Sequence, residues 1–135
     1  MATDIEYAIM SGRAYQSTRK NINQFPIPDG WMEENHKWND SSGFEAVSFR
    51  NKSNPKEIVI SFAGTNGITD IQDNLTNLDL GLIGRSCDQL RQAALYYCQV
   101  KKDNPDATIT FTGHSLGGGL AAVVGWGRAK LTSCY

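Results

Sequence analysis

One serine in the sequence is enclosed by glycines in a pattern that can do chemistry. Gly113, Ser115 and Gly117 form a G-x-S-x-G pentapeptide. When such a serine lies on a sharp turn from a strand to a helix, its hydroxyl projects above the sheet, and flanking glycines avoid steric clashes. The start of the following helix has free N–H groups and a dipole that favour developing negative charge. The pattern therefore predicts Ser115 as the nucleophile of an acyl-transfer reaction.

The neighbouring sequence supports this interpretation more than the pentapeptide does alone. A chain with 13 glycines can contain the pentapeptide by chance. However, a β-branched segment at residues 107–112 comes directly before it, and a small-residue segment at residues 116–125 overlaps and follows it. Strand, turn and helix in this order are the context that the motif requires. The alternative is a glycine-rich connection that packs closely against the sheet without a catalytic role.

A second segment has the composition of an oxyanion-hole loop. The apolar run at residues 58–63 is followed by Gly64 and Thr65. In this architecture the developing oxyanion is bound by the N–H of the residue after the nucleophile and by an N–H from the loop after an earlier strand. We therefore expect these donors to be the N–H groups of Leu116 and Thr65. The alternative is an ordinary turn that ends the strand.

The N-terminal third is predicted to contain a helix and a long polar loop. Residues 4–16 carry apolar side chains at near-helical spacing, with Thr3 as the expected N-cap. Residues 17–42 are polar and contain prolines and an Asp-Gly pair, so we expect a loop with one short strand near Trp31.

The rest of the chain alternates between strands and helices. We expect strands at 44–50, 58–63 and 107–112, and helices at about 87–103 and 116–125. Ser86 and Gln89 form the pattern of a capping box at the start of the long helix. Two strands joined by a crossover helix pair in parallel, so the sequence predicts an α/β fold with a mostly parallel sheet and flanking helices.

Composition excludes several functions. The chain has 135 residues, a mass of 14.9 kDa and a formal net charge of −1, which fits one domain and offers no basic patch for nucleic acid or anionic membranes. No stretch is long and apolar enough for a transmembrane helix, and the N-terminus lacks a signal-peptide pattern. Three cysteines make no disulfide framework, so we expect thiols. No Cys/His cluster has metal-ligand spacing, and we expect no metal and no cofactor.

Over about residues 44–124 the sequence resembles the class 3 lipases, the fungal-lipase-like branch of the α/β-hydrolases. The resemblance is carried by the segments at 58–65 and 109–121, with a long helix between them; Ala63 replaces the arginine that is typical of the family. It implies Ser115 as the acyl-forming nucleophile, Thr65 as an oxyanion-hole residue, and hydrolysis of esters in acylglycerols or phospholipids. The implied partner is a lipid or small ester substrate at a lipid–water interface, in lipid catabolism.

The resemblance also implies a lid between Gly67 and Gly84. Apolar residues recur there at spacings of three and four, which is typical of an amphipathic helix that covers an acyl site and opens on a lipid surface. The residues of this stripe are Ile68, Ile71, Leu75 and Leu78. A routine helix packed against the core explains the same pattern equally well.

The sequence lacks the partners that a serine nucleophile needs. α/β-Hydrolases place an Asp or Glu and then a His after the serine, but the 20 residues after Ser115 contain none of these. The two histidines, His36 and His114, are expected to be structural. We therefore expect residues 1–135 to be a single incomplete domain that lacks the C-terminal part of the fold, by truncation or a shifted frame near Gly125.

An incomplete sheet has a consequence for solubility. Without later strands, the uncharged strand at 107–112 has an exposed edge, at which we expect self-association.

The sequence thus favours a lipase-like serine ester hydrolase, and its missing triad partners put the activity of this chain itself in question. Two alternatives stay open: a non-catalytic fragment or interaction module that keeps the fold signature, and a serine hydrolase of another acyl class, such as a thioesterase. Localisation is undetermined, either cytoplasmic or exported through a signal outside this chain.

Overall fold

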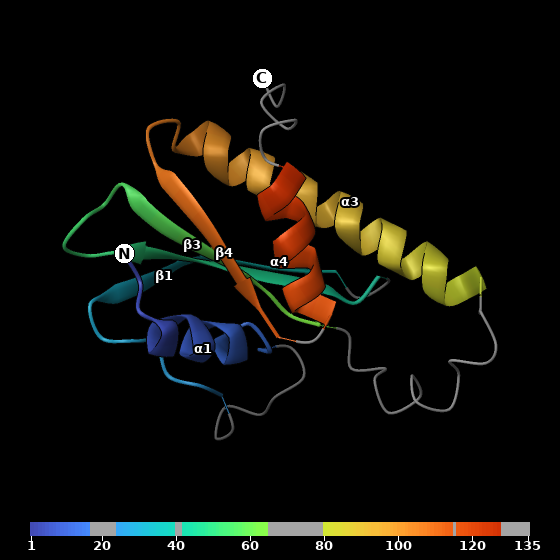
Figure 1. Cartoon of the computed structure of the whole chain (residues 1–135), viewed down its shortest axis with the longest axis horizontal. Coiled ribbons are helices and arrows are strands. Elements are labelled where there is room, and N and C mark those ends of the chain that lie inside the picture. Colours follow the sequence, from blue (N-terminus) through green and yellow to red (C-terminus); the bar gives the residue numbers. More distant parts are fainter. Residues whose placement is uncertain (17–23, 40–41, 65–79, 115, 128–135) are drawn as a thin grey trace.

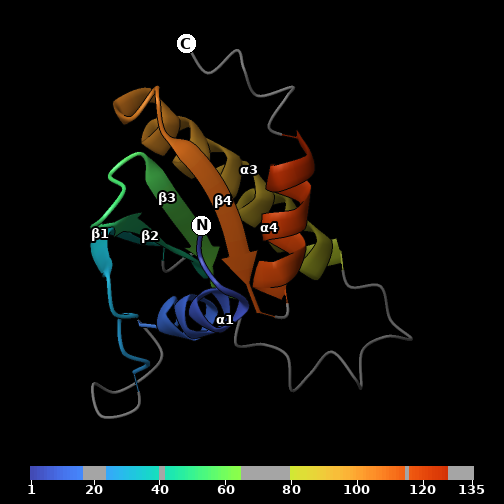
Figure 2. The ribbon, with the colours of Figure 1, turned by 60° about the vertical axis from the view of Figure 1, so that its left-hand side comes forward.

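A four-stranded sheet with helices on both faces makes up the computed structural model, which describes residues 1–16, 24–39, 42–64, 80–114 and 116–127 (Figure 1). The strands are β1 (Trp31–Asn39), β2 (Phe44–Asn51), β3 (Glu57–Phe62) and β4 (Thr108–Gly113), and the helices are α1 (Asp4–Arg13), α3 (Leu80–Asp103) and α4 (Leu116–Gly127). Helices α3 and α4 lie side by side, and α1 lies apart from them (Figures 1 and 2). The α/β class and the flanking helices are confirmed.

The sheet is mixed, and its parallel part is smaller than expected. The strand order is β1-β2-β3-β4, with antiparallel pairing of β1 with β2 and of β2 with β3, and parallel pairing of β3 with β4. Short connections join the first three strands, which favours antiparallel hairpins, whereas the long crossover through α3 allows the parallel pair. Among the described strands, the expectation of a mostly parallel sheet therefore holds only for β3 and β4.

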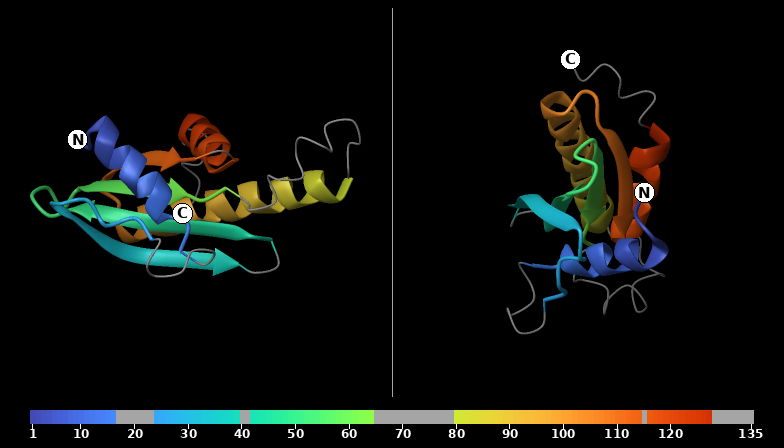
Figure 3. Two further views of the ribbon diagram at one scale, coloured as in Figure 1. Left: turned by 90° about the horizontal axis from the view of Figure 1, so that it is seen from below. Right: turned by 90° about the vertical axis from the view of Figure 1, so that its left-hand side faces the viewer.

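Strand β1 is longer than the short strand that was predicted near Trp31. It runs along β2 (Figure 3). It has nine residues, and the register of its pairing with β2 shifts between Glu33 and Asn35. Its polar residues face solvent at the edge of the sheet, so the sequence shows no apolar alternation. Charged residues and a bulge are common on edge strands because they discourage pairing with other chains.

The first helix begins as predicted. The side chain of Thr3 accepts a hydrogen bond from the Glu6 N–H at 3.2 Å, and Glu6 Oε2 accepts one from the Thr3 N–H at 2.7 Å. This reciprocal capping box satisfies two N–H groups at the helix start. The hydrogen bond from the Thr3 N–H also holds the pKa of Glu6 below its usual value.

The long helix begins earlier than predicted. Helix α3 starts at Leu80, and so the expected capping box at Ser86 and Gln89 is wrong. The Gln89 side chain is instead buried and donates a hydrogen bond to the Ser42 carbonyl at 2.7 Å. The expectation of thiols is also wrong for Cys98 on this helix, which is disulfide-bonded.

Two apolar clusters lie on opposite faces of the sheet. The cluster on the α3/α4 face is the larger and contains three stacked or tilted phenylalanines, Phe44, Phe62 and Phe111. The cluster on the α1 face packs Met10, Ala14 and further apolar side chains against β2 and β3. None of the described helices combines the length and apolarity that a membrane-spanning helix needs.

Candidate active site

The serine motif lies at a strand–turn–helix junction. Strand β4 ends at Gly113, His114 is an exposed residue of the turn, and α4 begins at Leu116. Ser115 itself lies outside the described residues. The N–H of Leu116 is in the first turn of α4, where backbone N–H groups have no partner within the helix. The local architecture is thus the one in which a G-x-S-x-G serine acts as a nucleophile.

Two glycines allow α4 to pack closely against β4. A Cβ atom at Gly118 would lie 3.0 Å from the carbonyl oxygen of Gly113, which is tighter than most real Cβ contacts, so a side chain here would require the backbone to shift by a few tenths of an ångström. A Cβ atom at Gly125 would lie 3.4 Å from the ring of Phe111 on β4. Helix α4 therefore runs directly along β4 (Figure 2) because small residues face the strand.

The end of β3 lies beside this junction. Strands β3 and β4 are parallel, and Phe62 is paired with Gly113 at the last position of their ladder. Since the carboxyl ends of parallel strands meet at one edge of a sheet, the chain leaving β3 at Gly64 and the chain leaving β4 at His114 are neighbours. This is where the sequence predicted an oxyanion-hole loop, although Thr65 lies outside the described residues.

One hydroxyl contacts both of these segments. The Oη of Tyr15 accepts a hydrogen bond from the Gly64 N–H at 3.0 Å and donates one to the His114 carbonyl oxygen at 3.1 Å. Tyr15 follows α1 and is 9% exposed. No signal in the sequence points to this role, since a tyrosine at near-helical spacing within residues 4–16 is typical of the buried face of a helix.

Helix α1 is fixed to β3 and β4 by side-chain hydroxyls. Ser61 Oγ donates to the Met10 carbonyl at 3.0 Å, and Thr112 Oγ1 donates to the Tyr7 carbonyl at 3.2 Å. The phenol of Tyr7 in turn donates to Thr110 Oγ1 at 3.0 Å. The bonds from Ser61 and Thr112 to the backbone of α1 set the position of the helix along the strands, and hence the position of Tyr15 at its end.

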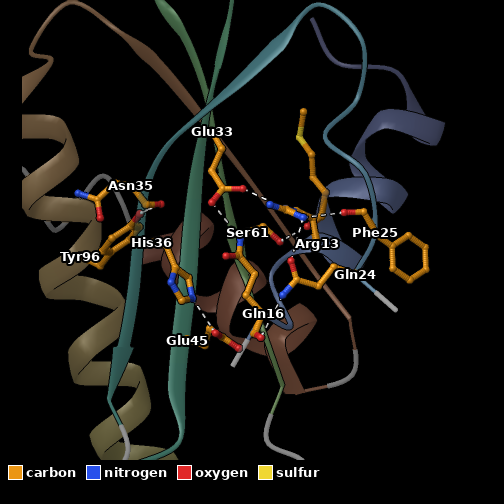
Figure 4. A network of polar contacts seen from close by, with 11 residues as sticks. Arg13, Gln16, Gln24, Phe25, Glu33, Asn35, His36, Glu45, Ser61 and Tyr96 are labelled. Atoms are coloured by element: carbon orange, nitrogen blue, oxygen red, sulfur yellow. Dashed lines mark hydrogen bonds and ion pairs between the residues drawn. The ribbon is translucent and has the colours of Figure 1, made fainter. Parts of the chain in front are cut away.

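A polar network ties the end of α1 to β1 (Figure 4). Arg13 forms an ion pair with Glu33 at 3.0 Å, and the side chain of Gln16 donates to the other oxygen of Glu33 at 3.0 Å. Arg13 also donates to the side chain of Gln24 and to the Phe25 carbonyl. The carboxylate of Glu33 therefore orders the chain on both sides of Tyr15.

The His36–Glu45 pair does not belong to the serine junction. His36 Nε2 lies 2.6 Å from Glu45 Oε2, and Glu45 is buried (Figure 4). His36 is on β1, three strands from β4, which corresponds to about 14 Å at the usual strand spacing. A general base must be within hydrogen-bond reach of the proton that it takes. The pair is too far away to serve a nucleophile at the β4–α4 turn.

One large pKa shift lies away from the junction. Burial raises the pKa of Tyr96, on α3, to about 12. Its hydroxyl donates to the Asn35 carbonyl at 3.2 Å. Tyr96 therefore stays protonated and structural at neutral pH.

Several predicted site residues cannot be compared with the structure. Thr65, Ser115 and the four predicted lid residues, Ile68, Ile71, Leu75 and Leu78, lie outside the described residues. Within the part that is described, no group of three His, Cys, Asp or Glu side chains is arranged to hold a metal ion.

The chain matches a known family over most of its length. The family model described as "Phospholipase-like: Tle-like phospholipase domain" matches residues 6–130.

Solved fungal lipases have the same fold. Lipase II from Rhizopus niveus matches with a TM-score of 0.66 and 18% identity, over 97% of this chain and 56% of the lipase. The triacylglyceride lipase of Rhizomucor miehei matches with a TM-score of 0.64 and 17% identity, over 98% of this chain and 58% of the lipase. The lipase of Rhizopus microsporus var. chinensis matches with a TM-score of 0.63 and 18% identity, over 98% of this chain and 55% of the lipase. The fold is fungal-lipase-like, and the chain spans about half the length of these lipases.

Proposed function

The chain belongs to the Tle-like phospholipase domain family, and from this premise we propose that it carries the nucleophile and the oxyanion hole of a serine carboxylic ester hydrolase. The observation that carries the proposal is the strand–turn–helix junction around the G-x-S-x-G motif, with the end of β3 beside it. The family and the fold support a lipase-like hydrolase in general. Ser115 as the nucleophile is our own assignment.

The proposed reaction proceeds through an acyl-enzyme. The Oγ of Ser115 attacks the ester carbonyl carbon and loses its proton to a base, and the N–H groups of Thr65 and Leu116 bind the resulting oxyanion. The carbon–oxygen bond to the alcohol then breaks, and the alcohol leaves with a proton. Water attacks the acyl-serine by the same route and releases the free acid.

The base of this reaction is not among the residues that we can assign. No His, Asp or Glu follows Ser115 in the sequence, and His36 lies three strands from β4. Because the chain spans about half of the solved lipases, we propose that the base and its carboxylate belong to a further part of the fold. The same observation favours one other function, a non-catalytic module that keeps the lipase fold.

The proposed substrates are lipid esters, either phospholipids or acylglycerols. The family description supports the first class and the structural neighbours support the second. The apolar stripe of Ile68, Ile71, Leu75 and Leu78 is the proposed contact with an acyl chain. A thioester substrate would indicate the third class of function, a hydrolase of another acyl group.

We also propose that the outer edge of β4 mediates self-association. Among the described strands, β4 pairs only with β3, and its residues, Thr108–Gly113, carry no charge. An unpaired, uncharged and β-branched edge favours pairing with another chain. Sedimentation at increasing protein concentration tests this: the expected result is oligomers, and a concentration-independent monomer contradicts it.

Labelling with a fluorophosphonate probe tests the serine assignment. In a protein that contains this chain together with the part of the fold that supplies the base, we expect the wild type to be labelled and Ser115→Ala to be unlabelled. Ser53→Ala is a matched control, because Ser53 is exposed in the turn between β2 and β3, and it should label like the wild type. Turnover of p-nitrophenyl esters of increasing chain length then reports acyl preference. An unlabelled wild-type chain would support the non-catalytic module, and labelling that persists in Ser115→Ala would remove Ser115 from its role.

A further inference from the structure

We propose that Tyr15 is a positioning residue that fixes the end of β3 and the β4–α4 turn relative to one another. The inference rests on the proposed function for its catalytic consequence. Its structural part concerns only described atoms: the Tyr15 hydroxyl, the Gly64 N–H and the His114 carbonyl.

The direction of both hydrogen bonds is determined by chemistry. The Gly64 N–H can only donate, so the phenol oxygen accepts from it at 3.0 Å. The His114 carbonyl can only accept, so the single phenol proton goes to it at 3.1 Å. Because one hydroxyl acts as acceptor and donor at the same time, the two bonds polarise and strengthen each other.

The phenol connects the two segments where the sheet ladder stops. The last register pair between the parallel strands is Phe62 with Gly113. One residue later, the Ala63 N–H donates to the Glu45 carbonyl on β2, in the direction away from β4. Among the described residues, the Gly64 N–H then donates to the Tyr15 hydroxyl, which in turn donates to the His114 carbonyl on the β4 side. The hydroxyl therefore connects the β3 and β4 sides just beyond the last paired residues, where the two candidate catalytic segments begin.

The phenol is held in place independently of these two segments. Tyr15 is buried in the cluster on the α1 face, together with Met10 and Ala14. The helix before it is bonded to β3 through Ser61 and to β4 through Thr112. Figure 4 shows the neighbouring Arg13 reaching toward Glu33 on β1. Tyr15 is thus a preorganised support and does not depend on the two segments for its position.

The two hydrogen bonds of the Tyr15 hydroxyl, to Gly64 and to His114, are called the Tyr15 clamp below. This clamp has two consequences for the proposed reaction. The Gly64 N–H is occupied by the phenol, so the oxyanion donor on this side comes from the residue after it, in agreement with Thr65. Holding the His114 carbonyl also fixes the plane of the peptide bond that leads to position 115, because the peptide unit is planar. Small errors in the placement of reacting groups reduce rates strongly, by about 100-fold for 1 Å.

The test compares two phenols, Tyr7 on α1 and Tyr15 just after it. Tyr15→Phe removes the bridging hydroxyl, and Tyr7→Phe removes a hydroxyl that contacts the middle of β4 at Thr110. Amide hydrogen exchange measured by NMR gives the structural readout. We expect the exchange of the Gly64 amide to rise about tenfold in Tyr15→Phe, while the Ala63 amide, bonded to Glu45, keeps its protection. Tyr7→Phe should change neither amide.

Fluorophosphonate kinetics, measured in a protein that also contains the part of the fold that supplies the base, gives the functional readout. In Tyr15→Phe we expect the maximal inactivation rate to fall about tenfold at an unchanged probe affinity and with the full fraction of protein labelled. A loss of folded protein would instead lower the labelled fraction and leave the rate of the remainder unchanged. Tyr7→Phe should label at the wild-type rate.

The outcomes separate this proposal from the proposed function. Unchanged Gly64 exchange in Tyr15→Phe, or equal slowing in both variants, overturns the clamp. If the wild-type chain is not labelled at all, the serine assignment fails and Gly64 exchange decides the clamp alone. If Tyr15→Phe does not fold, the wild-type chain still provides a test: the bridged hydroxyl proton should exchange slowly and give a nuclear Overhauser effect to the Gly64 amide, and the absence of both would refute the bridge.

Discussion

The two faces of the sheet are held by different kinds of interaction. On the α3/α4 face, the contacts are mainly apolar and aromatic, with ring centroids of Phe62 lying 6.1 Å from Phe44 and 6.2 Å from Phe111. On the α1 face, a smaller apolar cluster is supplemented by directional hydrogen bonds from Ser61 and Thr112 to the backbone of α1. The first face supplies bulk stability, and the second sets positions.

The difference between the two faces matters because the α1 face contacts the segments of the candidate site. Apolar packing is non-directional, and the hydrogen bonds that Gln89 and Tyr96 of α3 donate go to Ser42, before β2, and to Asn35 on β1, and not to the two segments of the candidate site. Hydrogen bonds require a distance and an angle. The α1 face ends in the Tyr15 hydroxyl, which contacts both segments of the candidate site. The interactions that position the candidate site therefore lie on the α1 face, which has the smaller apolar cluster.

The largest effect is expected from the aromatic cluster. Phe62 is 0% exposed, and Phe62→Ala removes its transfer free energy and leaves a cavity, so we expect a loss of about 3–5 kcal/mol in the free energy of unfolding. Urea denaturation measures this. Leu95→Ala on α3 is the control: Leu95 is 58% exposed, and its replacement should change the free energy by less than about 0.5 kcal/mol. Equal effects of the two substitutions would contradict the assignment of the core.

A smaller effect is expected from the hydroxyls of the α1 face. Ser61→Ala removes a buried hydrogen bond, but the Met10 carbonyl still accepts from the Ala14 N–H, so we expect a loss of about 1–1.5 kcal/mol. The exposed Ser53→Ala should cost almost nothing. We further expect faster amide exchange in α1 than in α3 in the Ser61→Ala protein. Uniform loosening of both helices would show that the two faces are not held separately.

Elements defined by local pattern could be predicted from the sequence. Thr3 is followed by acidic and apolar residues at helical spacing, which located α1, and the β-branched run before Gly113 located β4. Features that depend on tertiary contacts could not be predicted. The β1 strand is polar because it lies at the edge of the sheet, and α3 continues toward Leu80 through two glycines that lower helix propensity locally.

The candidate site follows the same division. The junction at Gly113 and Leu116 was predictable because motif and flanking pattern are contiguous in sequence. The contacts of Tyr15 could not be predicted, because Gly64 and His114 lie 49 and 99 positions after it in the sequence. In addition, a tyrosine at the end of a helical apolar pattern is usually an ordinary core residue. No local signal distinguishes the two roles.

The capping box at the start of α1 gives the next smaller effect. Thr3→Ala removes the acceptor for the Glu6 N–H, and we expect a loss of about 1 kcal/mol. Thr3→Ser keeps the hydroxyl and should stay close to the wild type. Thermal denaturation distinguishes them, and an Ala variant as stable as the Ser variant would show that α1 is held by its docking alone.

The smallest effect concerns Glu6 and depends on pH. Its folded-state pKa lies below the ordinary value of 4.5 because the carboxylate accepts from the Thr3 N–H. A lowered pKa stabilises the folded state above the unfolded pKa, and this contribution is lost as pH falls through the folded pKa. Glu6→Gln should therefore have a lower free energy of unfolding than the wild type at pH 7, and this loss should be smaller than the loss in Thr3→Ala. The difference between Glu6→Gln and the wild type should shrink near pH 3. A constant difference would exclude ionic capping.

The central claim is that the G-x-S-x-G junction presents a reactive serine. Its most direct test is to label a protein that contains this chain and the part of the fold that supplies the base with the fluorophosphonate probe, and to locate the adduct by tandem mass spectrometry. Trypsin releases the peptide Asp103–Arg128, in which Thr108, Thr110 and Thr112 compete with Ser115 as hydroxyl groups. We predict one adduct, on Ser115. An adduct on a threonine or on another peptide, or none, would contradict the account.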